Sequence, residues 1–115
     1  MHSPLTTIAD VSSRFGVSHR ALRFYEQRGL LRPVRIGRRR RYDAEEIDRV
    51  AVILKLKSFG FSLLEIDEIL SKPGDGQFGL TAQQCEAQLH ILRDQLADMR
   101  SAIAELETIC PPGVR

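Results

Sequence analysis

The feature that most constrains this chain is a run of apolar residues near its C-terminus that follows a strict seven-residue repeat. Successive members are separated by 4, 3, 4, 3, 4, 3 and 4 positions: Cys85, Leu89, Leu92, Leu96, Met99, Ile103, Leu106 and Cys110. A stripe of this kind predicts a coiled-coil helix, because it keeps one narrow apolar face turned toward a partner. Thr81 to Gln84 has the pattern of a capping box that would begin the helix. About 28 helical residues would span roughly 42 Å at about 1.5 Å per residue.

A helix of this length predicts a homodimer. The rest of the 115-residue chain is too small to cover the whole stripe, so much of it should meet a second copy. The residues expected at the dimer interface are Leu89, Leu92, Leu96, Met99, Ile103 and Leu106. The alternative is that the helix packs back on the N-terminal part of its own chain.

Two short helices are predicted near the N-terminus. Thr7 can cap the first, whose apolar positions follow a helical spacing, and Gly16 supplies the break. Ser18 can cap the second, which should run over about 19–28 and end before Gly29. Two short helices joined by so tight a turn predict a helix–turn–helix over residues 8–28.

The segment that follows cannot be a continuous helix, because Pro33 and Gly37 interrupt it. Two short runs, 34–36 and 40–42, flank a turn near Gly37 and predict a β-hairpin beside the helix–turn–helix. This wing would carry the densest charge of the chain: Arg35, Arg38, Arg39, Arg40 and Arg41. Adjacent arginines on a strand alternate sides, so two of the last four can point toward a ligand and two away.

Two further helices complete the head. Asp43 to Glu46 resembles a capping box that would open a helix to about Phe59, and Ser62 to Glu65 resembles another, opening a helix to about Ser71. We therefore expect a mainly α fold with a winged helix–turn–helix head at 5–71 and a small β-hairpin as its wing. A linker rich in glycine should follow at 72–80, then the long coiled-coil dimerisation helix at 81–110 and a short tail at 111–115.

The charge is divided unevenly along the chain, whose formal net charge is +2. Residues 1–60 carry 13 Lys and Arg against 6 Asp and Glu, which is +7, and residues 61–115 carry 4 against 9, which is −5. The asymmetry indicates that the first half meets a polyanion, although two solvated surfaces of unequal charge are the alternative.

The second short helix has the side chains that reading DNA requires. An α-helix fits the major groove, and its N-terminal polar residues reach the base edges. The candidates here are Ser18, His19, Arg20, Arg23 and Tyr25. Arg20 and Arg23 share a face, and arginine can make paired hydrogen bonds to guanine or phosphate. The wing arginines would add affinity and salt dependence rather than base choice. His19 is more simply explained as a solvated side chain.

These residues resemble the mercury-resistance regulator (MerR) family, in a short form without a sizeable effector domain. The similarity covers about residues 5–71 and continues more loosely into the long helix, and it is carried by 7–10, 16–18, 20–26, 29–33, 40–42 and 60–66. The resemblance implies an antiparallel coiled coil joining two winged heads on a pseudo-palindromic site in promoter DNA. It also implies bending and untwisting of that DNA, which lets RNA polymerase engage both promoter elements.

The resemblance also implies particular roles for single positions. Ser18, Arg20, Arg23 and Tyr25 match the recognition helix, Arg40 the wing arginine, and Tyr42 the tyrosine that closes the wing. Lys57 and Ser62 fall in a second wing, where contacts to phosphate are usual. Arg38 and Arg39 depart from the family pattern, since a glycine–tyrosine pair is common there, and they should strengthen phosphate binding.

The signal that would control such a regulator is the least readable feature. Cys85 and Cys110 resemble the layout of metal-sensing members, but no second cysteine or histidine follows Cys110. A complete Zn²⁺ or Cu⁺ site is therefore not predicted, and no cofactor is assigned. Burial as small apolar residues is one alternative. Another is a metal or redox signal, because an antiparallel coil would bring Cys85 near Cys110 of the partner subunit.

Other function classes have weaker support. An architectural or excisionase-like DNA-binding protein is the alternative, since such proteins share the winged head but often lack the coiled-coil seam. An enzyme is not expected, because the histidines are scattered and no nucleophile–base pair or phosphate-binding glycine loop is seen. The chain has no long apolar run and no secretory signal, so we expect a cytoplasmic protein with no membrane partner.

Overall fold

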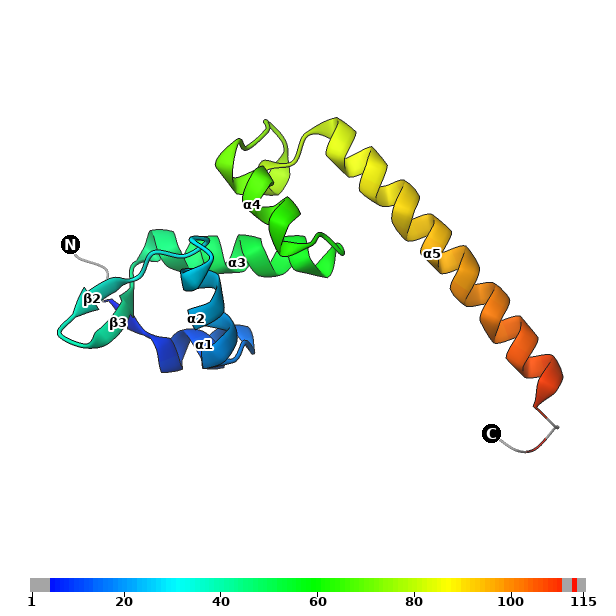
Figure 1. The fold of residues 1–115 in the computed structure, drawn as a ribbon, viewed down its shortest axis with the longest axis horizontal. Helices are drawn as coiled ribbons and strands as arrows, with labels where there is room; N and C mark the ends of the chain where they lie inside the picture. The colour runs from blue at the N-terminus through cyan, green and yellow to red at the C-terminus, as the bar shows by residue number, and fades with distance from the viewer. Residues whose placement is uncertain (1–4, 111–112, 114–115) are drawn as a thin grey trace.

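Residues 5–110 and residue 113 are described in the computed structural model, which places them in a head followed by a rod (Figure 1). The elements are β1 (Thr6–Thr7), α1 (Ile8–Phe15), α2 (His19–Gln27), β2 (Val34–Ile36), β3 (Arg39–Tyr42), α3 (Ala44–Ser58), α4 (Leu63–Ser71), a 3₁₀ turn η1 (Gln77–Gly79) and α5 (Ala82–Ile109). The predicted fold class, a winged helix–turn–helix head with a long C-terminal helix, is confirmed. Apart from Gly113, the tail predicted at 111–115 lies outside the described residues.

The helices begin where the sequence predicts, because a side chain caps each one. The cap hydroxyl or carboxylate oxygen accepts a hydrogen bond from the backbone N–H three residues ahead in all five α-helices, at Thr7, Ser18, Asp43, Ser62 and Thr81. Such a bond satisfies one of the amides that a helix start leaves without a partner. Complete capping boxes form at Ser62 and Thr81.

One predicted capping box is only half formed. Asp43 accepts a hydrogen bond from the Glu46 amide at 2.8 Å, as expected. The Glu46 carboxylate, however, accepts a hydrogen bond from the Arg32 backbone N–H at 2.9 Å instead of reaching back to the cap. This contact joins the start of α3 to the loop before the wing.

The wing belongs to a three-stranded antiparallel sheet with the order β1-β3-β2. The predicted hairpin of β2 and β3 is present, with Arg35 opposite Arg40 and Ile36 opposite Arg39. Strand β1 is only two residues long, pairs Thr6 with Tyr42, and was not predicted from the sequence. Because β1 leads straight into α1, it fixes the helix–turn–helix to the root of the wing.

A single apolar core holds the head together. Its buried members come from every helix of the head and from the segments between them: Val11, Leu22, Tyr25, Leu30, Leu31, Tyr42, Val50, Ile53, Leu56, Phe61, Ile66, Ile69 and Leu80. Burying a side chain of this size stabilises a fold by about 1.5–3 kcal/mol. The outward face of α2 therefore rests on a packed support, whereas the hairpin of the wing reaches the core only through Tyr42.

The segment predicted as a linker, residues 72–80, is an ordered turn rather than a free chain. The Gly74 amide donates to the Gly79 carbonyl at 2.7 Å, and the Gly76 amide donates to the Leu80 carbonyl at 3.0 Å. A Cβ at Gly76 would lie 2.4 Å from the Leu80 oxygen, so the turn needs glycine there. The Phe78 ring meets the Phe59 ring edge-on, with the centroids 6.1 Å apart.

The rod joins the head through a small junction. Gln88 is 7% exposed, and its side-chain amide donates to the Phe59 carbonyl at 2.7 Å. Gly60 lies beside it with φ +92°, and a Cβ there would be 2.9 Å from the Gln88 amide nitrogen. The absence of a side chain at Gly60 thus leaves room for the Gln88 amide to reach the Phe59 carbonyl.

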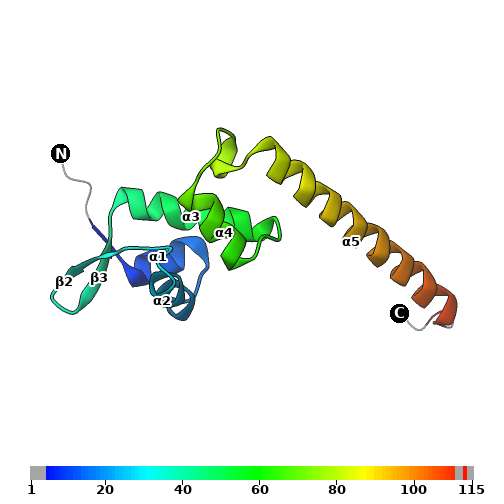
Figure 2. The same cartoon turned by 45° about the horizontal axis from the view of Figure 1, so that its top comes forward.

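Beyond this junction α5 extends away from the head, as two views show (Figures 1 and 2). No residue of α5 after Gln88 is buried in the described chain. The apolar stripe of the heptad repeat, called the seam from here on, therefore does not pack back on its own head. The apolar seam side chains stay exposed, from 36% at Leu92 to 61% at Met99. Helices that could cross a membrane were not found within the part of the chain that the structure describes.

The junction makes Gly60 sensitive to substitution. Gly60→Ala should lower the free energy of unfolding by about 1–3 kcal/mol, because it adds a Cβ both at a positive φ and against Gln88. Gly16→Ala is the matched control, since Gly16 also has a positive φ but nothing within 4 Å of its Cβ position. Chemical denaturation should show the larger loss for Gly60→Ala; equal losses would contradict this account of the junction.

Candidate nucleic-acid interface

Helix α2 separates a buried face from a polar one. Leu22 and Tyr25 pack into the core, with 0% and 3% exposure. The opposite face borders a shallow hollow of about 540 Å³, lined by Ser18, Arg20, Ala21, Arg23, Phe24 and Gln27. Arg20 and Arg23 are both exposed there, one turn apart. A helix anchored by its inner face and cationic on its outer face is suited to the major groove of DNA.

Sequence reasoning missed two members of this face, Phe24 and Gln27. Phe24 is 43% exposed although it is a large aromatic residue, and Gln27 lies three residues further along the same helix. An amide side chain can pair with adenine, and an apolar side chain can contact the thymine methyl group. Their helical spacing from Arg20 and Arg23 was the signal that could have found them.

The wing presents arginines on both faces of its hairpin. Arg35 and Arg40 are opposite each other across the strands. Arg39 and Arg41 alternate with Arg40 along β3 and so lie on the other face. Arg38 and Arg39 are exposed and Arg41 is half-buried, its guanidinium donating to the Arg40 carbonyl at 3.0 Å. Arg40 and its neighbours Arg39 and Arg41 thus lie on opposite faces of β3, whereas Arg38 lies in the turn before the strand, so the predicted two-and-two division of the four arginines is not seen.

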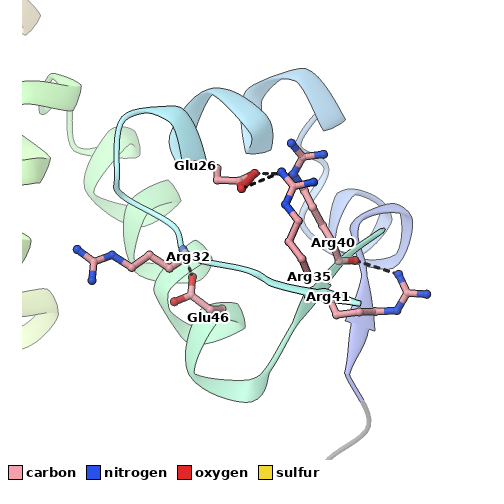
Figure 3. A network of polar contacts seen from close by, with 6 residues as sticks. All are labelled: Glu26, Arg32, Arg35, Arg40, Arg41 and Glu46. Carbon is pink, nitrogen blue, oxygen red and sulfur yellow. Dashed lines mark hydrogen bonds and ion pairs between the residues drawn. The ribbon is translucent and has the colours of Figure 1, made fainter. Parts of the chain in front are cut away.

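Glu26 of α2 connects the recognition helix to the wing (Figure 3). Its Oε1 atom accepts a hydrogen bond from Nε of Arg40 at 2.5 Å, and its Oε2 atom accepts one from Nη2 of Arg35 at 3.3 Å. Burial raises the pKa of Glu26, but the hydrogen bond and charge of Arg40, together with Arg35, outweigh it and hold the pKa below its ordinary value. Glu26 was absent from the predicted site, because the sequence does not reveal which strand residues meet α2.

The two predicted tyrosines are core residues. Tyr42 is 0% exposed and belongs to the core of the head, which corrects its expected contact with DNA. Burial raises the pKa of its phenol, with a further rise from the charge of Glu26. Tyr25 is 3% exposed, and its hydroxyl lies 3.4 Å from Nζ of Lys57 on α3. Lys57 itself is exposed, with Nζ 5.7 Å from the centre of the Tyr25 ring.

The remaining predicted positions fall in three places. Ser18 is exposed at the start of α2, where its hydroxyl caps the helix, and His19 next to it is half-buried. Ser62 is exposed at the start of α4 and serves as its cap. Cys85 and Cys110 are free, exposed thiols near the two ends of α5. Among residues 5–110 and 113, no group of three His, Cys, Asp or Glu could hold a metal ion.

Together the fold and this surface define a winged helix–turn–helix protein of the DNA-binding class. Residues 6–72 match the model of the MerR HTH family regulatory protein, and residues 47–109 match the model described as MerR, DNA binding. The chain belongs to the MerR family of DNA-binding transcriptional regulators.

Individual relatives agree with this assignment. The mercuric resistance operon regulatory protein of Shigella flexneri is 32% identical over 109 residues, which cover 90% of this chain and 76% of that protein. A MerR-family transcriptional regulator from Bacillus cereus superposes with a TM-score of 0.74 at 26% identity, covering 97% of this chain and 87% of that one. The structure of HiNmlR, a MerR family regulator lacking the sensor domain and bound to promoter DNA, superposes with a TM-score of 0.53 at 25% identity. The match covers 92% of this chain and 82% of that one.

The ion pairs of Glu26 predict a pH effect on stability. A lowered pKa means that their stabilisation is present above the ordinary value of 4.5 and is lost as the pH falls through the lowered pKa. The free energy of unfolding of the wild-type protein should exceed that of Glu26→Gln by on the order of 1 kcal/mol near neutral pH. The two free energies should converge as the pH is lowered. Denaturant unfolding at a series of pH values measures the difference, and a gap that stays constant with pH would count against the ion pairs.

Proposed function

We propose that this protein binds a two-fold symmetric promoter site as a homodimer, with α2 of each copy in the major groove and each wing on the adjoining phosphates. The observation that carries the proposal is the exposed face of α2, where Arg20 and Arg23 stand on a helix whose other face is buried. The structure of HiNmlR with promoter DNA supports the same use of this fold. Because the proposed ligand is promoter DNA, we expect the protein to act in the cytoplasm.

The wing would supply affinity that does not depend on sequence. Arg38 and Arg39 are exposed at its tip, and the four consecutive arginines line a hollow beside the start of α1, together with Thr7. Guanidinium groups and the free amides of a helix start both favour phosphate oxygens. Lys57 and Ser62 lie near the turn between α3 and α4 and would make the second-wing contacts.

The exposed seam of α5 supports the homodimer. A helix with a strict heptad repeat and no cover in its own chain favours pairing with a second copy. An antiparallel pair centred between Leu96 and Met99 would set Leu89 beside the partner's Leu106. Leu89 also borders an apolar hollow of about 240 Å³ against the head, lined by Phe59, Phe61, Leu80, Cys85, Gln88 and Leu92. The end of the partner's rod would thereby cover this hollow.

Distortion of the DNA would complete the regulatory mechanism. Two heads held at a fixed separation by a rigid rod can bend and untwist the DNA between them, because their contacts offset the cost of deformation. RNA polymerase would then share the same DNA. The excisionase-like alternative is less favoured, since the family models together extend from the head to residue 109 near the end of α5.

The protein's own binding site provides the direct test. Duplexes selected from a random pool by the wild-type protein should converge on an inverted repeat, and footprinting should protect two symmetric half-sites. On the selected duplex, Arg23→Ala should lose about 1–3 kcal/mol of discrimination against scrambled DNA. Lys72→Ala, which removes a charge at the end of α4, is the control and should retain the preference. Continuous, filament-like protection would favour the architectural alternative.

The dimer is tested at the centre of the seam. Leu96→Glu should halve the mass in solution, because it places a charge where two copies of the apolar stripe meet. Ser101→Glu adds the same charge at an exposed position outside the seam and should leave the mass unchanged. Light scattering measures both. A Leu96→Glu variant with the same mass as wild type would show that the seam has another partner.

A further inference from the structure

The recognition helix and the wing contain one acidic residue among many basic ones. Between residues 18 and 42 there are nine arginines, and Glu26 is the only carboxylate. It does not point freely into solvent, since only 22% of its side chain is exposed. It lies instead between the wing and α2, in contact with two of the nine arginines (Figure 3).

The contacts of Glu26 reach both strands of the wing. Arg40 is on β3 and Arg35 is on β2, directly opposite it, so one carboxylate fastens both strands to the recognition helix. Each guanidinium group has five N–H donors, and the contacts with Glu26 engage one nitrogen of each arginine. The arginines are thereby held in position while other donors remain free to meet phosphate.

The same carboxylate lowers the positive charge of this surface. Binding to DNA without regard to sequence depends chiefly on how many phosphates the cations neutralise. Selective binding depends in addition on the position of the base-reading residues. A carboxylate paired with Arg35 and Arg40 reduces the number of phosphates that these cations can neutralise. By fixing the wing to α2, the same carboxylate helps to hold the base-reading residues in position.

We propose that Glu26 is a specificity-determining positioning residue, which suppresses sequence-independent binding by Arg35 and Arg40 and holds the wing in register with the recognition helix. The inference rests on the proposed DNA binding. Its consequence is that the ratio of affinities for the selected and a scrambled duplex depends on a residue that reads no base itself.

The test compares Glu26→Gln with wild type on both duplexes over a range of salt concentrations. Glutamine keeps the shape and removes the charge, so binding to scrambled DNA should gain about one phosphate contact and its salt slope should steepen by about 0.9. Between about 50 and 200 mM salt this is an extra change of about 3.5-fold in affinity. Affinity for the selected duplex should rise less, so the ratio should fall.

Two further variants separate charge from position. Glu45→Gln removes one exposed carboxylate at the start of α3, outside the network, and should leave the slope and the ratio as in wild type. Glu26→Asp keeps the charge but shortens the side chain, so it should lose the hold on both strands and lower the ratio without steepening the slope. If Glu26→Gln does not fold by circular dichroism, Glu26→Asp decides the question through the ratio.

The outcomes distinguish this inference from the function on which it rests. Wild-type protein that prefers no duplex over the scrambled one would overturn the proposed function. Wild-type protein with a clear preference, and a Glu26→Gln variant that matches Glu45→Gln in slope and ratio, would overturn the role of Glu26 alone. An unchanged ratio in Glu26→Asp would do the same.

Discussion

The position of the rod relative to the reading head depends on one hydrogen bond and one missing side chain. Gln88 donates to the Phe59 carbonyl, and Gly60 leaves the space in which this bond forms. Gln88 is buried, and a buried amide without a partner is costly, so the bond favours one angle of α5 over others. Around it, Phe78 and Leu80 from the preceding turn add apolar contacts. The direction in which α5 leaves the head follows from this junction.

That direction bears on the proposed dimer, because a symmetric pair of rods would convert the angle at each end into the distance between two α2 helices. Helix–turn–helix dimers bind half-sites that lie about one helical turn of DNA, or a multiple of it, apart. A small change at the junction would therefore be magnified along a rod of 28 residues. The hollow beside Leu89 and Leu92, at the same place, would let the partner's rod end press directly on the junction.

The sequence predicted the helices well because their determinants are local. Caps such as Thr7 and Ser62 act within three residues, and the seam of α5 is a repeat that needs no tertiary contact to be seen. What it did not predict depends on contacts between distant segments. Strand β1 exists through pairing with β3, and the contact of Phe78, in the turn at 72–80, with Phe59 also joins separate segments. Glu26 gained its role only when the wing folded against α2.

The same distinction explains why the site was only partly foreseen. An exposed arginine on a helix can be inferred from its spacing, whereas Tyr25 and Tyr42 could be assigned to the core only once the packing was known. The charges differ in the same way: nine arginines between residues 18 and 42 suggest strong binding to any DNA. Glu26, the only carboxylate in that stretch, forms ion pairs with two of them. A regulator that must find one site among many others gains more from such restraint than from one further cation, because its occupancy depends on the ratio of affinities.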